Sequence, residues 1–301
     1  MSKKILVVGS TNTDMVVKAA HLPRPGETIL GGKFLMNAGG KGANQAVAAA
    51  RLGAQVTFVC KTGNDIFGQQ SKQLFVNEGI DTTYVFSDDD HPSGVALITV
   101  NAQAENCIVV ASGANACLFP ADLVNATDVV EQSDIVLMQL EIPMETIEYV
   151  AELACSKGKT VILNPAPAQS LSKSLLQKIS ILTPNETEAG MISGIAVTDT
   201  ASAIEAARAI CAMGVQTVII TLGAKGALIY TDEFQEQIPT GKVEAVDTTA
   251  AGDVFNGALA VALSENKTIT NAVQFACKAA SISVTRIGAQ ASAPYRDELK
   301  G

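Results

Sequence analysis

The stretch that decides the fold is residues 245–258, which read Ala-Val-Asp-Thr-Thr-Ala-Ala-Gly-Asp-Val-Phe-Asn-Gly-Ala. A turn-rich segment runs through two alanines and a glycine into Asp253, and an apolar helical pattern follows. The unpaired N–H groups in the first turn of a helix attract anions, and small residues let a ligand come close to them. Asp253 therefore lies where an anion would bind, although its own charge opposes one. Its role is either helix capping or catalysis, and this segment alone leaves both open.

Composition limits the class of protein. The 301 residues are 48% hydrophobic and 17% charged, which predicts a packed globular chain. A net charge of −9 argues against a nucleic-acid-binding protein, which needs a basic face. Six scattered cysteines indicate a reducing compartment, and no apolar run has the length of a membrane span. We expect a cytoplasmic protein without a nucleic-acid or membrane partner. Only two histidines, His21 and His91, leave little room for His-based metal sites.

Short apolar runs alternate with helical patterns along most of the chain. Solid apolar runs predict buried strands at 4–9, 56–60, 135–139, 160–163, 179–182, 217–222 and 227–230. Helical periodicity predicts helices at about 42–52, 66–78, 143–157, 186–193, 200–213, 251–265 and 268–286. Repeated βα units predict an α/β fold, in which a central, mainly parallel sheet carries helices on both faces.

Two stretches lack a helix of their own. Residues 15–36 hold short β-like pieces broken by proline and glycine, and residues 94–101 and 106–111 flank a polar turn as in a hairpin. We expect a small β-sheet lid, formed by about 15–36 and 94–111 and inserted in one domain that spans 1–301. The lid is either a flap over a site or an ordinary antiparallel extension.

Polar and glycine-rich segments follow several predicted strands, where open α/β sheets place their ligands. Residues 9–14 lack the second glycine of a dinucleotide fingerprint, although Asn12 and Asp14 lie near a strand end. Residues 39–44, Gly-Gly-Lys-Gly-Ala-Asn, are not a Walker A loop. They are either a tight helix entry or a place where a ligand approaches the backbone, with Lys41 and Asn44 as donors that suit a polyhydroxyl ligand.

Three further segments each have a structural and a functional interpretation. Glu141 follows a buried strand and is either solvated or part of a site. Residues 183–188 hold either a capping box, in which Thr183 pairs with Glu186, or an outer shell for hydrated Mg²⁺ made by Asn185 and Glu188. Residues 221–226 form either a hairpin turn or a nucleotide cradle.

In this order, the segments 9–14, 39–44, 185–188, 221–226 and 247–253 resemble the ribokinase branch of the ribokinase-type (pfkB) carbohydrate kinases. Residues 39–46 and 247–258 are the most specific, and the segment 284–290 is also similar. The resemblance covers essentially the whole chain. It implies ATP-dependent phosphorylation of D-ribose at O5, which gives ribose 5-phosphate and ADP.

The resemblance also implies a role for each matching residue. Asp253 would be the general base, and the transferring phosphoryl group would bind the backbone N–H groups of Ala250, Ala251, Gly252 and Asp253. Ribose would contact Asn12, Asp14, Gly40, Lys41, Gly42, Asn44 and Glu141, and Ala96 and Ile98 from the lid. ATP would contact Asn185, Thr221, Leu222, Gly223, Ala224, Lys225, Gly226, Gly252 and Cys277, which stands where relatives often carry a polar residue beside adenine. Glu188 would hold Mg²⁺ through water, and K⁺ would lie near Asp247, Thr249, Ser283, Arg286, Gly288 and Ser292.

Two alternatives stay open at this point. One is a sibling kinase that acts on another sugar or on a nucleoside, although few aromatic residues are present for stacking on a base. The more distant one is a non-catalytic regulator that binds a sugar or a nucleotide. Exposed edges of the lid further suggest a homodimer.

Overall fold

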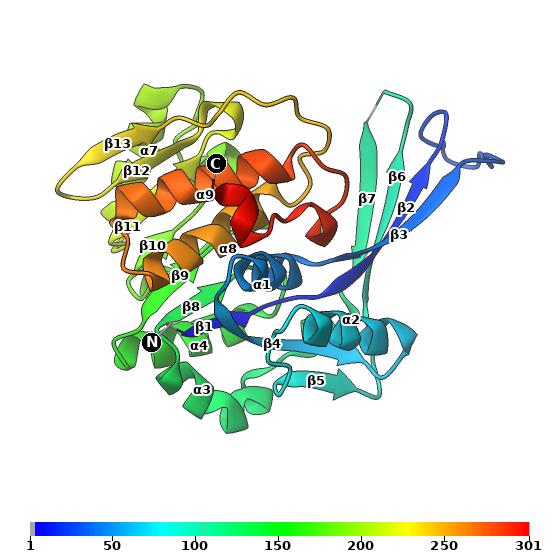
Figure 1. Ribbon diagram of the computed structural model, residues 1–301, viewed down its shortest axis with the longest axis horizontal. Coiled ribbons are helices and arrows are strands. Elements are labelled where there is room, and N and C mark those ends of the chain that lie inside the picture. The colour runs from blue at the N-terminus through cyan, green and yellow to red at the C-terminus, as the bar shows by residue number, and fades with distance from the viewer. Residues whose placement is uncertain (1–3, 104, 301) are drawn as a thin grey trace.

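The computed structural model describes residues 4–103 and 105–300. Its body is built on a nine-stranded sheet (Figure 1). In spatial order the strands are β13 (Gln235–Ile238), β12 (Ala227–Tyr230), β11 (Thr217–Thr221), β10 (Ile181–Leu182), β9 (Thr160–Leu163), β8 (Ile135–Met138), β1 (Lys4–Val8), β4 (Gln55–Gly63) and β5 (Val85–Asp88). All neighbours pair in parallel except β11–β12 and β12–β13, which are antiparallel. The predicted α/β fold is confirmed.

Helices cover both faces of this sheet and bury a separate core on each (Figure 1). One core is formed with α1 (Lys41–Arg51), α2 (Ile66–Asn77), α8 (Ala251–Ser264) and α9 (Ile269–Ser283). The other is formed with α3 (Thr127–Gln132), α4 (Met144–Ser156), α5 (Lys173–Leu176), α6 (Glu186–Ser193) and α7 (Thr200–Cys211). The strand β1 contributes Ile5 and Val7 to the first core and Leu6 and Val8 to the second, as the two-residue period of a strand requires.

The second sheet projects from the body as the predicted lid (Figure 1). Its four strands, in spatial order, are β3 (Lys33–Gly39), β2 (Asn12–Lys18), β6 (Gly94–Val100) and β7 (Asn106–Ala111). The first pair of lid strands extends three residues further at each end than the predicted 15–36. The reason is that Asn12–Asp14 pairs with Asn37–Gly39, so both ends of the lid continue into the body.

The sequence prediction missed short or peripheral elements. The strand β13 is an edge strand whose Gln-Glu-Gln-Ile sequence has no apolar run, and β5 lies at the opposite edge. The helices α3 and α5 are short, and α9 ends at Ser283 instead of residue 286. Five 3-10 turns, η1 (Gly113–Cys117), η2 (Pro120–Ala126), η3 (Gly223–Lys225), η4 (Gln290–Ser292) and η5 (Arg296–Leu299), complete the described elements. No described helix is long and apolar enough to cross a membrane.

Candidate active site

The start of α8 presents free backbone N–H groups. Its N-cap is Ala250, whose φ of 61° lies in the left-handed region, a conformation that an alanine adopts only under strain. The amides of Ala250, Gly252 and Asp253 have no acceptor within the described chain, whereas that of Ala251 donates to the Thr248 carbonyl at 3.2 Å. A strained helix start with three free donors is a candidate anion hole.

Asp253 does not cap this helix. Its side chain is 6% exposed and points to α1, where Asn44 Nδ2 donates to Oδ2 at 2.8 Å and Gln45 Nε2 donates to Oδ1 at 3.0 Å. Burial raises the pKa of Asp253, while Lys41 and the two amides oppose that rise. The capping interpretation of Asp253 is therefore wrong. A carboxylate held by two amides beside an anion hole is arranged as a base.

Close packing of α1 against α8 creates this contact. A Cβ on Gly257 would lie 2.8 Å from the Gln45 carbonyl oxygen and from Ala48 Cβ, so only glycine lets the two helices approach so closely. Gln45 is itself fixed, because its Oε1 accepts from Gln139 Nε2 at 2.6 Å. Sequence reasoning did not assign Gln45 a role. A polar glutamine within an alanine-rich helical face could have indicated that Gln45 contacts another buried polar group.

Four carboxylates surround one ammonium group at the end of β1 and the start of α1. Burial alone lowers the pKa of Lys41, but the charges of Asp253, Glu141, Glu188 and Asp14 raise it above its ordinary value. The Glu141 carboxylate accepts from the Ser10 hydroxyl at 2.5 Å and from the Lys41 amide at 3.0 Å. Glu141 is therefore part of this cluster and not a solvated loop residue.

The glycines that precede α1 fit the backbone together. A Cβ on Gly39 would lie 2.2 Å from Asp14 Oδ2, and one on Gly42 would lie 2.6 Å from the Ser10 amide nitrogen. Gly40, with φ 87°, turns the chain into the helix. These glycines serve a tight helix entry, and the groups that face the site are Lys41 and Asn44. Asn44 Oδ1 is buried without a protein partner, as expected for an acceptor reserved for a ligand.

The lid adds an apolar wall beside Asp14. In the register of the lid, Asp14 pairs with Ala96, and Val16, on the same face of β2, pairs with Ile98. Ala96 and Ile98 therefore share the face of the sheet that carries Asp14. This arrangement favours a flap over a site.

Asn115 fixes Asn12, a residue predicted to contact the sugar. Asn115 Nδ2 donates to Asn12 Oδ1 at 2.8 Å and to the Thr11 carbonyl at 2.9 Å, and Asn115 Oδ1 accepts from the Thr11 amide. Because Oδ1 of Asn12 is occupied in this way, its amide nitrogen is left as a donor. No motif in the sequence pointed to Asn115, which lies in a 3-10 turn 103 residues further along the chain.

Ionisation of Asp14 is expected to destabilise the ligand-free protein. Burial, and then the charges of Glu141 and Asp253, raise the pKa of Asp14 from 3.8 to about 6. Because the folded pKa is the higher one, the stability cost is absent below about pH 4, grows as pH rises to about 6, and persists above that. A shift of about two pKa units corresponds to at most about 3 kcal/mol.

We therefore expect Asp14→Asn to increase the free energy of unfolding at pH 8 and to change it little at pH 4. Urea unfolding at both pH values measures the difference, and Asp232→Asn, at an exposed position, is the control. Equal effects of Asp14→Asn at the two pH values would contradict the assignment of a raised pKa.

A cavity of 540 Å³ lies on the other side of the α8 start. Of the residues predicted to contact a nucleotide, it is lined by Thr221, Gly223, Ala224, Gly226, Gly252 and Cys277. Burial raises the pKa of Cys277 to about 11, so its thiol is neutral in this wall. The sequence prediction missed other residues that line the cavity, among them Thr240, Gly241, Lys242, Val243, Ala245, and Ala280 and Ser281 of α9.

The segment 221–226 is a hairpin turn and a cavity wall at once. It joins the antiparallel strands β11 and β12, and a Cβ on Gly226 would lie 1.9 Å from the Ile238 carbonyl oxygen. Leu222 and Lys225 do not line the cavity, because the first side chain is buried in the core and the second is exposed.

The capping box at α6 differs from the predicted one. Asn185 is the N-cap, its side chain accepts from the Glu188 amide at 2.8 Å, and Glu188 Oε2 accepts from the Asn185 amide at 2.8 Å. The predicted pairing of Thr183 with Glu186 is wrong, since the Thr183 hydroxyl donates to Asn256 Oδ1. Glu188 is buried, which raises its pKa, and its other oxygen remains available to a hydrated Mg²⁺.

Residues predicted to hold K⁺ lie on two adjacent segments behind the anion hole. Asp247 joins the segments, because its oxygens accept from the amides of Thr249 and Gly288 at 2.9 Å each. Ser283 and Ser292 are buried, and their hydroxyls donate to main-chain carbonyls. The Arg286 side chain forms an ion pair with Glu298, so only the main-chain carbonyl oxygen of Arg286 could bind K⁺. An all-oxygen donor set around a carboxylate suits a hard cation.

A buried carboxylate, an anion hole and a nucleotide-sized cavity that meet at one helix start define a phosphotransferase of small molecules. The model of the pfkB family of carbohydrate kinases matches residues 2–296. The chain belongs to this family.

Individual members of this family are similar to the chain over nearly its whole length. The chain is 47% identical to ribokinase of Haemophilus influenzae over 298 residues, which cover 99% of this chain and 97% of the relative. It is 38% identical to deoxyribokinase of Salmonella typhi, with 98% and 97% covered. The solved structure of Arabidopsis thaliana ribokinase complexed with ribose and ATP superposes with a TM-score of 0.94 at 33% identity, covering 99% of this chain and 98% of that one.

Proposed function

We propose that the protein is an ATP-dependent ribokinase, which phosphorylates D-ribose at O5 and releases ribose 5-phosphate and ADP. The observation that carries this proposal is Asp253, a buried carboxylate held by Asn44 and Gln45 one residue from the amide of Gly252, which lines the cavity. Ribokinase relatives at 41–47% identity support the choice of sugar. A non-catalytic regulator would not need a base in this position.

In the proposed mechanism, the sugar lies between the acidic cluster and the lid. Asp14, Glu141 and Asn44 Oδ1 accept hydrogen bonds from sugar hydroxyls, and Lys41 and Asn12 donate to others. Ala96 and Ile98 cover the sugar and exclude water, which limits wasteful hydrolysis of ATP. We also propose that the lid and the body act as one domain of residues 1–301.

Asp253 removes the proton of the O5 hydroxyl as the bond from O5 to the γ-phosphorus forms and the bond to the ADP oxygen breaks. The amides of Ala250, Gly252 and Asp253 stabilise the charge on the transferring phosphoryl group. The Ala251 amide also donates to the phosphoryl group once its hydrogen bond to the Thr248 carbonyl breaks. The cavity residues hold adenosine, and Cys277 is part of the cavity wall.

Glu188 is proposed to hold Mg²⁺ through water, and the segments around Asp247 and Ser283 to hold K⁺. When bound, these cations neutralise phosphate charge and add positive potential behind the anion hole. At both proposed cation sites, the groups of this chain that would bind the ion are oxygen atoms. The need for ATP and the free cysteines both suit the cytoplasm.

An assay of ADP release tests the substrate directly. Purified protein is given ATP and Mg²⁺ with ribose, deoxyribose, fructose or adenosine, with and without K⁺. We expect the highest kcat/KM with ribose in the presence of K⁺. The deoxyribokinase relative makes deoxyribose the most informative competitor. A preference for deoxyribose, fructose or adenosine over ribose would contradict the proposal.

We further propose that two copies pair through the outer face of the lid, opposite to Asp14. In one row across this face, Met36, Met15, Leu97 and Val109 are register neighbours. Three of them are largely exposed, Met36 at 48%, Leu97 at 55% and Val109 at 61%. Such an apolar patch on a sheet is typical of an interface.

Light scattering is expected to give the mass of a dimer for the wild type and of a monomer for Leu97→Lys. The control is Val124→Lys, which changes an equally exposed apolar residue on η2, outside the lid. A wild-type monomer at the same concentration would contradict the proposed dimer.

A further inference from the structure

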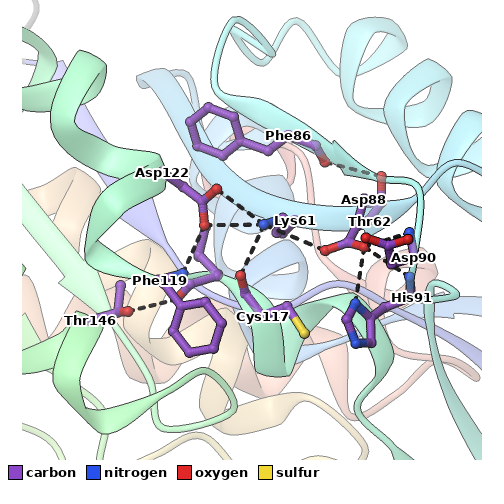
Figure 2. Close-up of polar contacts among 11 residues, drawn as sticks. Lys61, Thr62, Phe86, Asp88, Asp90, His91, Cys117, Phe119, Asp122 and Thr146 are labelled. Carbon is purple, nitrogen blue, oxygen red and sulfur yellow. Dashed lines mark hydrogen bonds and ion pairs between the residues drawn. The ribbon is translucent and has the colours of Figure 1, made fainter.

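Asp88, His91 and Cys117 lie close together beside Lys61, and the proposed mechanism uses none of the three (Figure 2). A carboxylate oxygen, a ring nitrogen and the Cys117 sulfur lie within 4.8 Å of one another. Asp88 ends β5, His91 lies in the turn that leads to β6, and Cys117 ends η1, which follows β7. Sequence spacing did not reveal the cluster, because the cysteine lies 26 positions after the histidine and only folding brings them together.

The charges around the cluster favour a cation. Lys61 Nζ lies 3.5 Å from Asp88 Oδ2, but Asp122 neutralises it with contacts of 3.1 and 3.2 Å (Figure 2). Asp89 and Asp90 follow Asp88 directly in the chain. Two carboxylates, Asp88 and Asp122, therefore share the Lys61 ammonium group, and a bound cation would offset the remaining negative charge.

The donor set selects the kind of cation. A thiolate, an imidazole and a carboxylate are the ligands of Zn²⁺, whereas Mg²⁺ and Ca²⁺ prefer oxygen alone. Zinc bonds of about 2.0–2.3 Å at tetrahedral angles place ligand atoms roughly 3.5 Å apart, so the side chains need to move together by about 1 Å. The His91 side chain is 52% exposed and can rotate, so that zinc can replace the 3.1 Å hydrogen bond between His91 Nδ1 and Asp88 Oδ1.

We propose that Asp88, His91 and Cys117 bind Zn²⁺, with water as the fourth ligand. The imidazole binds in its neutral form, and the Cys117 thiol releases its proton to solvent as the sulfur–zinc bond forms. The open fourth position and the exposed histidine leave the ion accessible from solvent.

Such an ion would tie together the two ends of the β6–β7 hairpin. His91 lies three residues before Gly94, where β6 begins, and Cys117 follows Ala111, where β7 ends. The two segments already touch, because the Ala114 amide donates to the Pro92 carbonyl at 2.8 Å. Zinc would add a cross-link to this contact and stabilise the attachment of the lid to the body.

Cobalt titration of the metal-stripped, full-length protein tests the site. Co²⁺ bound to a thiolate gives a charge-transfer absorption band, and Zn²⁺ should displace it. We expect one equivalent of Co²⁺ per chain in the wild type and loss of the band in Cys117→Ser and in His91→Ala. His21→Ala and Cys155→Ser, which change an exposed histidine and an exposed cysteine elsewhere, should bind as the wild type does.

A second measurement covers the case in which a variant folds poorly. Zn²⁺ at 100 times its dissociation constant should raise the midpoint of thermal unfolding of the wild type and leave that of His91→Ala unchanged. The proposal is overturned if the wild type shows no saturable thiolate band, or if the band persists in Cys117→Ser or in His91→Ala.

Discussion

Replacing Asp253 with asparagine is expected to reduce kcat by about 10³-fold, within the range typical for loss of a general base. Asparagine keeps the shape of the side chain but cannot take the proton of the sugar hydroxyl. The cavity that is proposed to hold the nucleotide is lined by Gly252 and not by Asp253. The dissociation constant for ADP should therefore change less than threefold.

Steady-state kinetics and calorimetric titration with ADP measure these two quantities. Asp232→Asn makes the same chemical change at an exposed position and should leave both at wild-type values. Because Asn44 and Gln45 both donate to Asp253, the variant loses one acceptor, and its thermal unfolding should be recorded alongside. Near-normal turnover in a folded Asp253→Asn variant would remove Asp253 as the base.

Replacing Gly252 with alanine is expected to have opposite effects on stability and on activity. A Cβ at this position would have no atom within 4 Å, so the fold does not require glycine there. Alanine is a better helix former than glycine by up to about 1 kcal/mol, so stability should increase. The added methyl group would enter the space proposed for the phosphates, and kcat/KM for ATP should fall by about 10²-fold.

Gly190→Ala is the matched control, since Gly190 is also helical and its Cβ would meet its nearest atom at 3.4 Å. This variant should gain stability with wild-type kinetics. Urea unfolding and a titration of ATP in the kinase assay separate the two effects. If Gly252→Ala were both more stable and fully active, the anion hole would not lie at the start of α8.

The acidic cluster shows why stability and function oppose each other in this protein. Burial and neighbouring carboxylates raise the pKa of Asp14 to about 6, so the free protein carries a destabilising charge near neutral pH. A sugar whose hydroxyls donate to these oxygens would relieve this cost. Active sites commonly keep such unfavourable groups for the ligand.

The sequence by itself determined the fold class and most of the proposed site. Solid apolar runs and helical periodicity are local properties, and they predicted the alternating strands and helices of the body. Polar residues after buried strands, such as Asp14 and Glu141, could be assigned to one edge of the sheet, because parallel strands end on the same side.

Only the tertiary structure decided how these groups act. The capping and catalytic interpretations of Asp253 were equal in sequence, and the contacts from Asn44 and Gln45 separated them because α1 packs against α8 through Gly257. The position of Asn115 against Asn12 likewise joins residues that are distant in the chain. The cluster of Asp88, His91 and Cys117 arises in the same way. Contacts between remote segments leave no periodic pattern in the sequence, and so they appear only when the chain is folded.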